Sequence, residues 1–331
     1  MKKKKFDLRN YSLLLILIVM GVICSLLSSN FLTWKNITNI LKQVSVVTIL
    51  AFAQGMIIIS GNIDLSIGYL ASMSGTFACI VYIGLNPSMG VAPALVIAFL
   101  VGILIGAVVG AFNGLFVAHF NLPAFIVTLA MQTVCLGSIL KYTNGQSVYK
   151  IGAFSNMGQL VIGGFLPITI IFMLIMMVIT HVLLKYSKFG RYLYAIGGNA
   201  EAANAAGVQV RKVKWSIFIV SGIFAAVAGM VMMGRLNAGI PGEGAGYETD
   251  AITAAVIGGT SFSGGAGTAT GMLLGSIIVG VLNNIMTLLG IDSYTQMIVK
   301  GLIIILAVLL DSISKSGKSG IKIMASKKES A

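Results

Sequence analysis

The strongest constraint on this chain is a series of apolar runs, each long enough to cross a membrane, that recurs from its beginning to about residue 311. A helix needs roughly 20 apolar residues to cross a bilayer, because every backbone N–H and C=O must be paired within the segment. With 57% hydrophobic and 9% charged residues, the chain has too little polar surface to cover a water-soluble protein of 331 residues. The sequence therefore predicts an all-α polytopic membrane protein.

The apolar runs between polar or Gly- and Pro-containing breaks predict ten spans, with a short eighth span. They lie near residues 12–29, 41–60, 65–84, 93–118, 123–140, 163–184, 214–233, 250–262, 269–289 and 295–311. The first run resembles a signal peptide but continues without a clear small-x-small cleavage site, so we expect a retained helix, with cleavage as the alternative. Residues 1–331 then form one transmembrane domain.

Basic residues at the span ends predict the orientation, because cytoplasmic loops retain positive charge. With the N-terminus inside, the outer side holds Lys35, Lys42, Lys141, Lys150 and Arg235, and Lys300 lies within the last span. The other 16 of the 22 basic residues fall inside. We therefore expect cytoplasmic tails at residues 1–11 and 312–331 and a cytoplasmic segment at 185–214.

The order of polar features indicates an inverted repeat, with chance as the alternative. In the first half, Asp64 is followed by two spans, the second of which contains Asn113, and then by a third span. In the second half, Asp250 is followed by two spans, the second of which contains Asn283, and then by a third span. Asp64 falls at the inner side and Asp250 at the outer side, as in many transporters with inverted repeats.

Four glycines at every fourth position mark one face of the fourth span. Glycines at this spacing let a second helix approach closely. We expect this face to pack within the subunit, with a subunit interface or flexible gate as the alternative. The four are Gly102, Gly106, Gly110 and Gly114.

The cytoplasmic segment 185–214 contains a short Ala-rich helix, which Asn199 can cap and Gly207 can end. Small residues on its faces favour docking into a cleft of another protein. An interfacial helix that only joins two spans is the alternative.

A few polar residues interrupt the apolar spans. Such groups at membrane depth are costly, and they line a pathway or bond another helix. Asp64 is interpreted as a pathway or gate residue, or as the cap of the following helix; for the amides in later spans, hydrogen bonds between helices are the favoured use. The candidates for the translocation path or gate are Asn62, Asp64, Gln132, Asn283 and Asn284.

Several functional classes find no support in the sequence. The net charge of +13 comes from basic residues at span ends, not from a patch that would read nucleic acid. Gly317-Lys318-Ser319 lacks the Gly that a phosphate-binding loop needs at position 312, which is Ser312. His119 and His181 are isolated, and the three cysteines lie too far apart for a metal knuckle. We therefore expect no enzyme, metal or cofactor site in this chain.

Six stretches in order resemble the permease subunits of bacterial ABC importers for ribose, related monosaccharides and autoinducer-2. They cover the chain from about residue 40 to residue 311, and their combination is specific to that family. They are Gly61–Gly68 (GNIDLSIG), Leu122–Leu129 (LPAFIVTL), Ala195–Asn199 (AIGGN), Asp250–Ile252 (DAI), Gly258–Ser261 (GGTS) and Tyr294–Gly301 (YTQMIVKG).

The resemblance implies a non-catalytic permease of the bacterial inner membrane. Its implied partners are cytosolic ABC ATPases that bind ATP and Mg²⁺, a second identical or different permease subunit, an extracytoplasmic binding protein and membrane lipids. The implied ATPase contact is a coupling helix at Gly198, Asn199, Glu201, Ala202, Ala203 and Gly207. Asn62 departs from the family, which commonly has Gly there.

The resemblance does not identify the sugar. Few charged residues in the spans suit a neutral solute that moves by alternating access. The rival function is an ion- or proton-coupled secondary transporter, for which only Asp64 and Asp250 could supply the ion site.

Overall fold

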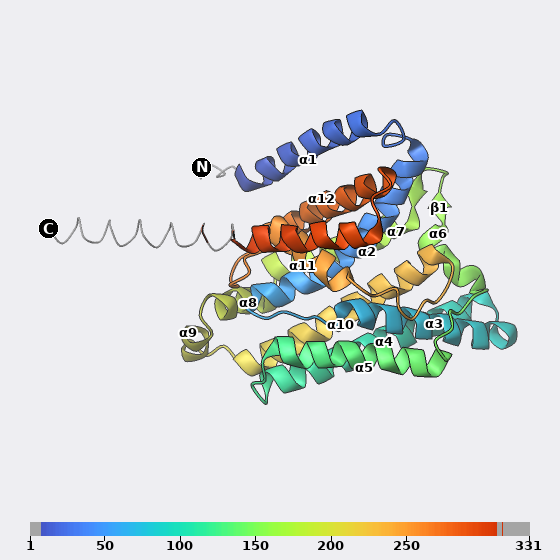
Figure 1. The fold of residues 1–331 in the computed structure, drawn as a ribbon. Helices are drawn as coiled ribbons and strands as arrows, with labels where there is room; N and C mark the ends of the chain where they lie inside the picture. Colours follow the sequence, from blue (N-terminus) through green and yellow to red (C-terminus); the bar gives the residue numbers. More distant parts are fainter. Residues whose placement is uncertain (1–7, 310–312, 314–331) are drawn as a thin grey trace.

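The computed structural model describes residues 8–309 and residue 313, with side chains described from residue 12 (Figure 1). Most of the two predicted tails, and Gly317-Lys318-Ser319, therefore lie outside the described residues. The longer helices are α1 (Leu8–Leu27), α2 (Trp34–Ile59), α3 (Ile67–Met89), α4 (Val91–Ala118), α5 (Ala124–Thr143), α7 (Ile168–Lys185), α10 (Val210–Leu236), α12 (Ala269–Leu288) and an unlabelled helix at Ser293–Leu309. The shorter ones are η1 (Gly152–Ser155), α6 (Asn156–Gln159), α8 (Lys188–Gly198), α9 (Ala200–Ala205) and α11 (Tyr247–Ile257).

The helices confirm the all-α polytopic class. In the described part of the chain, seven helices are long and apolar enough to cross a membrane: α2, α3, α4, α5, α7, α10 and α12. The apolar parts of the first and last helices, Ser12–Leu27 and Ser293–Leu309, are shorter. A helix lies at each of the ten predicted positions, and the number of complete spans stays a prediction.

The starts of α2 and α7 differ most from the prediction. α2 begins at Trp34 rather than at about residue 41, because its polar first turns continue the helix beyond the apolar run. α7 begins at Ile168, because β1 (Val161–Ile162) and β2 (Leu166–Pro167) form an antiparallel hairpin before it. Gly163 and Gly164, both with positive φ, make the turn of this hairpin.

The predicted eighth span is the 11-residue helix α11, followed by a glycine-rich loop at residues 258–268. α11 stops at Gly258, whose backbone lies against that of Gly271 in α12, so that a side chain at either glycine would collide with the other's carbonyl oxygen. Thr260 and Ser261 in the loop are buried. Irregular backbone within a membrane is tolerated only where protein or a water-filled cavity surrounds it.

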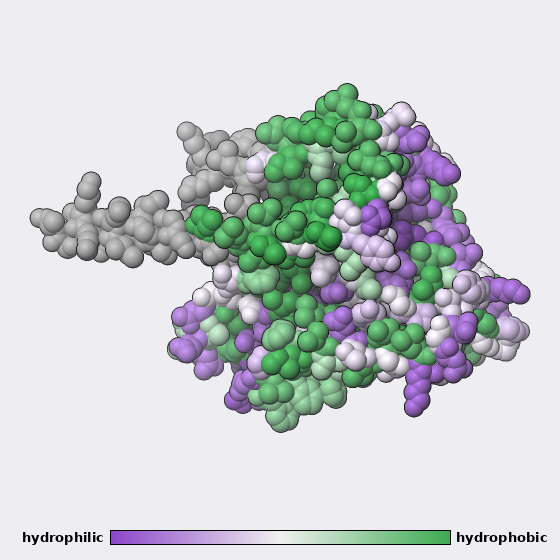
Figure 2. Space-filling view, in the orientation of Figure 1, coloured by the Kyte–Doolittle hydropathy of each residue, from purple (hydrophilic) through white to green (hydrophobic). Residues whose placement is uncertain are grey.

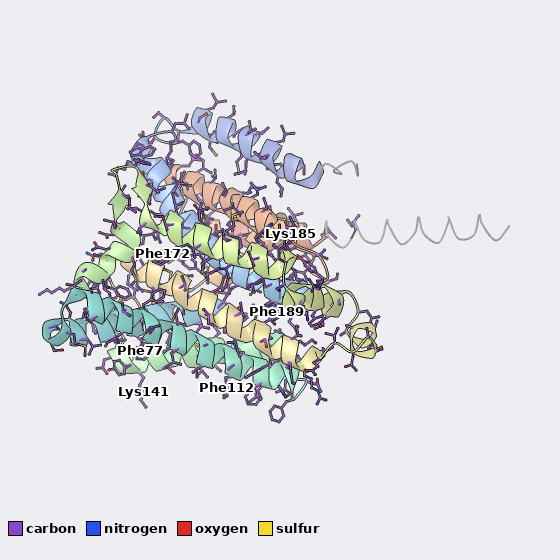
Figure 3. All side chains as sticks on the ribbon, turned by 180° about the vertical axis from the view of Figure 1, so that it is seen from behind. Phe77, Phe112, Lys141, Phe172, Lys185 and Phe189 are labelled. Carbon is purple, nitrogen blue, oxygen red and sulfur yellow. The ribbon has the colours of Figure 1, made fainter. Side chains whose placement is uncertain are left out.

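On the face shown in Figure 2, hydrophilic residues gather toward the two ends and hydrophobic residues cover much of the surface between them, as expected of a membrane protein. α1 begins, and the Ser293–Leu309 helix ends, at the side that carries α8 and α9 (Figure 1). Lys141 and Lys185 lie toward opposite ends (Figure 3). The structure thus places α8 and α9 at the same end as the beginning of α1 and the end of the Ser293–Leu309 helix, and that this end is cytoplasmic stays a prediction.

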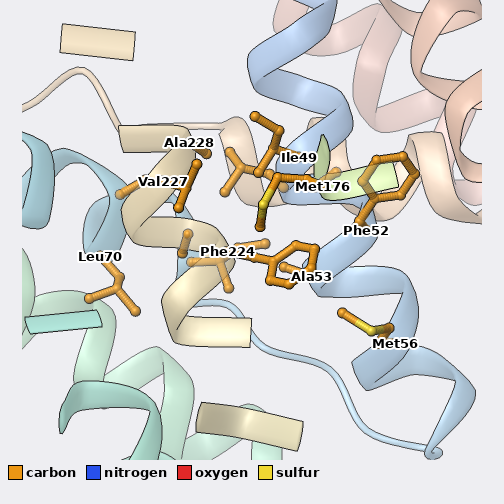
Figure 4. Packing of buried hydrophobic residues seen from close by; sticks show 14 of the residues in the cluster. Ile49, Phe52, Ala53, Met56, Leu70, Met176, Phe224, Val227 and Ala228 are labelled. Atoms are coloured by element: carbon orange, nitrogen blue, oxygen red, sulfur yellow. The ribbon is translucent and has the colours of Figure 1, made fainter. Parts of the chain in front are cut away.

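The core is built around α2 and α10. Residues 44–59 of α2 are all buried. Ile49, Phe52, Ala53 and Met56 of α2 lie near Phe224 of α10 and Met176 of α7 (Figure 4). A helix that is buried on every side needs no polar face, and this is why α2 and α10 are apolar around their circumference at membrane depth.

The four glycines at every fourth position of α4 lie against α10. A Cβ at Gly106 would collide with the backbone oxygen of Gly222, and one at Gly110 with that of Phe218. Gly102 lies against the Met230 side chain, and Gly114 lies against Trp215. This face of α4 therefore packs within the subunit.

The helices of the two halves pack reciprocally. α10, in the second half, packs on α3 and α4 of the first half, while α2 packs on α11 and α12 of the second half. Such an exchange is what two intertwined repeats produce, so it supports the predicted inverted repeat.

Candidate functional site

The predicted coupling segment folds into α8 and α9, two short helices joined at Asn199. Ser187 begins α8 by accepting a 3.0 Å hydrogen bond from the Gly190 backbone N–H. Asn199 ends α8 and caps α9, because its Oδ1 accepts a 2.9 Å hydrogen bond from the Ala202 N–H. Gly207, at φ +84°, turns the chain toward α10.

α9 exposes most of its surface. Glu201, Ala202, Asn204 and Ala205 are exposed, whereas Ala203 is buried against the rest of the protein. Gly198 has open space where a side chain would stand. The end of the molecule that carries α9 thus presents a narrow projection of small residues.

α8 connects this projection to the membrane helices. Gly197 fits directly against the backbone oxygen of Ile59, the last residue of α2, and against the N–H of Gly265. That N–H also donates a 2.9 Å hydrogen bond to the Ile59 oxygen. The Tyr194 hydroxyl donates a 2.8 Å hydrogen bond to the backbone oxygen of Gly267. α8 therefore contacts both the end of α2 and the glycine-rich loop.

A positively charged groove of about 690 Å³ lies beside α9. Arg211, Lys212 and Lys214 from the start of α10 line it, with Glu201 as its one carboxylate. His119 and Asn121 complete the side formed by the end of α4. The groove and the projection together suit a partner surface that has a cleft and negative charge.

The first polar cluster surrounds Asp64, between α2 and α3. Asp64 Oδ1 accepts hydrogen bonds from the backbone N–H and the hydroxyl of Ser66, at 2.8 and 2.6 Å. The Asn113 amide of α4 donates a 3.0 Å hydrogen bond to that hydroxyl. The Thr128 hydroxyl of α5 accepts one from the Leu65 N–H, also at 3.0 Å. Asp64 thus holds the turn that leads into α3, at the N-cap residue Ser66, and joins a hydrogen-bonded chain between helices.

The Gln54 side chain of α2 holds the backbone of this turn. When its amide nitrogen faces the backbone carbonyl of Asp64, Gln54 donates a 3.0 Å hydrogen bond to that carbonyl oxygen. Its amide oxygen then accepts a 3.3 Å hydrogen bond from the Asp64 backbone N–H. The neighbouring Asn62 bonds only locally, to the Ser60 backbone and hydroxyl. Asn62 is half-buried, whereas Asp64 is buried.

The second polar cluster surrounds Asp250 in α11, toward the opposite end. The Lys300 ammonium lies 3.0 Å from Asp250 Oδ2, and the Asn283 amide donates to the same oxygen at 3.2 Å. Glu248, two residues earlier, is also buried. The ion pair ties α11 to the Ser293–Leu309 helix, and the Asn283 hydrogen bond ties α11 to α12.

The five path candidates do not form one site. Asn62 and Asp64 lie near the α8 end, and Asn283 lies in the Asp250 cluster. Asn284 instead exchanges two hydrogen bonds with Asn36 of α2, at 3.0 and 2.8 Å. Gln132 is half-buried on α5 and bonds no described side chain or backbone group. The sequence offered Ser66 to Gly68 as the place that Asp64 would cap, but it did not reveal Thr128 and Lys300 as partners; the lone lysine in an apolar span was the one available signal.

In the described residues, no group of three or more His, Cys, Asp or Glu side chains is placed to hold a metal ion. Cys24, Cys79 and Cys135 are buried free thiols.

Residues 36–308 match the family model described as the permease component of branched-chain amino acid transport systems. The chain belongs to this permease family. It is also 41% identical to the ribose import permease RbsC of Bacillus subtilis strain 168 over 298 residues, which are 89% of this chain and 90% of that protein.

Two further relatives have similar coverage. RbsC of Escherichia coli strain K12 is 41% identical to this permease over 305 residues, which are 90% of this chain and 92% of that protein. The xylose transport system permease XylH of Haemophilus influenzae is 31% identical over 376 residues, with 95% and 99% coverage.

Membership of this family makes the chain a non-catalytic translocation subunit and a multi-pass protein of the bacterial inner membrane. Permeases of this kind work with ABC ATPases and substrate-binding proteins. No reactive pair is therefore needed in the permease, and its polar clusters must be explained by binding, packing or movement.

Proposed function

We propose that this chain is the permease subunit of an ATP-driven importer for a monosaccharide. The relatives named for ribose and xylose, which match about nine-tenths of the chain, carry the proposal. Few charged side chains lie within the spans, and Lys300 neutralises Asp250 among them, which suits a neutral solute. The named sugars of the relatives make ribose the first candidate and xylose the second.

The proposed assembly contains two permease subunits, identical or homologous, two cytosolic ATPases and an extracytoplasmic binding protein. ATP and Mg²⁺ bind to the ATPases, and this chain carries no cofactor. The exposed small residues of α9 fit a cleft in the ATPase, and Arg211, Lys212 and Lys214 beside it attract acidic groups.

The proposed mechanism is alternating access. Closure of the ATPases moves α9, and α8 passes the movement to the end of α2 and to the glycine-rich loop through the Gly197 contact and the Tyr194 hydrogen bond. The permease has two conformations in which its helices pack differently and which differ in stability. The ATPases shift the equilibrium between these two conformations. The binding protein selects the solute, so the path through the permease need not hold it tightly.

The proposal is tested in proteoliposomes that contain the permease, its ATPase and its binding protein. Ala202→Trp enlarges the exposed tip of α9, and we expect it to abolish both ATPase copurification and sugar uptake. Ala92→Trp, exposed at the opposite end of the molecule, is the matched control and keeps ATPase copurification. Uptake driven by an ion gradient without ATPase would support a secondary transporter instead. Titration of the binding protein with ribose and xylose identifies the sugar.

A further inference from the structure

A polar cavity of about 630 Å³ lies at the end of the molecule opposite α8 and α9 (Figure 1). Residues from the first turns of α2 and from the ends of α6, α10 and α12 line it. In the predicted orientation this end faces outward, toward the binding protein. The contacts proposed for the ATPase lie at the other end, so they do not account for this cavity.

Hydrogen bonds between the helices hold the wall of the cavity together. Asn36 of α2 and Asn284 of α12 exchange two, at 3.0 and 2.8 Å. The Gln159 amide, at the end of α6, donates to the backbone oxygen of Arg235 at 3.3 Å. The Lys42 ammonium donates to the backbone oxygen of Gln159 at 3.4 Å. Because four helices are bonded to one another around it, the cavity is a formed site rather than a gap between mobile side chains.

Several polar groups of the lining take no part in this network. Asn39 and Gln43 lie one turn apart on α2, and their side chains make no hydrogen bond to any residue that the structure describes. The amide oxygen of Gln159 likewise accepts none from the described residues. Arg235 also lines the cavity, and its Nε is buried without an acceptor. The cavity thus offers a ligand both donors and acceptors.

The two cationic groups of the lining already have partners within the protein. Lys42 is bonded to a backbone oxygen, and the Arg235 guanidinium donates to the Tyr247 hydroxyl at 3.3 Å. The charge of Arg235 also acts on the Glu243 carboxylate. An anion would have to compete for these groups, whereas a neutral ligand needs only the unused amides and Nε.

The rest of the lining is apolar. Leu236 of α10 and Leu288 of α12 lie beside the amides. Amide side chains that both donate and accept suit hydroxyl groups, which also do both, and apolar side chains suit the C–H groups of a sugar ring. The volume falls in the range of small-molecule sites.

We propose that this cavity is an entry site that binds the transported monosaccharide when the binding protein releases it. Asn39 and Gln43 bond the sugar hydroxyls, and Arg235 Nε donates to a further hydroxyl. The inference rests on the proposed importer function and adds a second place at which the sugar is recognised. Because the ligand is small and must leave again during transport, the dissociation constant is in the millimolar range.

The binding test uses the purified complex of permease and ATPase in nanodiscs, without the binding protein. Saturation-transfer NMR with ribose and with xylose should give a saturable signal for the transported sugar, with a dissociation constant of about 1–10 mM. Asn39→Leu and Gln43→Leu should each raise this constant at least about fivefold. Gln146→Leu, which removes an exposed amide at the same end but outside the lining, is the matched control and should leave it unchanged.

Uptake into proteoliposomes separates this inference from the proposed function. The double variant Asn39→Leu/Gln43→Leu should lower the maximal rate of uptake about fivefold. ATPase copurification and the affinity of the binding protein for sugar should not change. The substituted side chains bond no described residue, so the variant should fold.

An importer that takes up ribose or xylose while its permease gives no saturable sugar signal would overturn the entry site and leave the proposed function standing. Equal dissociation constants in the wild type and the double variant would also overturn it. Displacement of the sugar by equimolar inorganic phosphate would identify an anion site instead. If the assembly takes up neither sugar, the proposed function fails and the entry site fails with it.

Discussion

The Tyr194 hydroxyl of α8 donates a 2.8 Å hydrogen bond to the backbone oxygen of Gly267, in the loop that precedes α12. Seventy-three residues separate the two groups along the chain. The side chain is half-buried, so the bond is partly shielded from water. It links the predicted cytoplasmic segment to a loop that is otherwise packed within the membrane helices.

Tyr194→Phe should weaken this link without opening a cavity. The loss of one neutral hydrogen bond costs about 1 kcal/mol, so the variant should fold. We expect sugar uptake per ATP hydrolysed to fall several-fold, because the movement of α8 reaches the glycine-rich loop less completely. Both rates are measured in the reconstituted importer. Tyr192→Phe, on the exposed face of α8, is the control and should match the wild type.

Gly197→Ala and Gly198→Ala form a matched pair at the end of α8. A Cβ at Gly197 would collide with the Ile59 backbone oxygen, whereas one at Gly198 meets no atom within 4 Å. Backbone cannot move aside as a flexible side chain can, so Gly197→Ala should separate α8 from α2. We expect it to lower the unfolding temperature and abolish uptake, and Gly198→Ala to leave the unfolding temperature unchanged. Equal unfolding temperatures would mean that the contact is not required.

Lys300→Met should destabilise the permease through the carboxylate it leaves behind. Asp250 is almost fully buried, while about a quarter of the Lys300 side chain is exposed. Breaking a fully buried pair costs about 3–5 kcal/mol, and the partial exposure should reduce this to about 2 kcal/mol. The double variant Asp250→Asn/Lys300→Met should recover most of the loss. A double-mutant cycle on denaturant unfolding measures the difference, and additive single effects would contradict it.

The positions of the helices could be predicted because bilayer crossing imposes a length and an apolar composition on each segment. The same rule predicted a short eighth span, but it did not reveal that α11 ends where the backbone of Gly258 packs against that of Gly271. Nor did it predict that the polar first turns of α2 are helical, since apolar runs mark only the part of a helix at membrane depth.

The candidate site was predictable in part. Asn199 and Gly207 have chemistry that marks a helix cap and a helix end, and the structure places them there. The pairing of Asp250 with Lys300 across 50 residues depends on how three helices pack, which no local pattern encodes. The contact of Gly197 with Ile59 is likewise tertiary, and a glycine in sequence does not reveal what lies against it.

The orientation of the permease is tested by cysteine labelling in intact cells, because the three native cysteines are buried and should react little. Ala205→Cys lies on the exposed surface of α9, and we expect a membrane-impermeant maleimide to label it only after the cells are opened. Gln146→Cys, exposed beyond the other end of α5, should be labelled in intact cells. The pair controls for reagent access, since each variant reports one side. Labelling of Ala205→Cys from outside would reverse the orientation and remove α9 from any cytosolic ATPase.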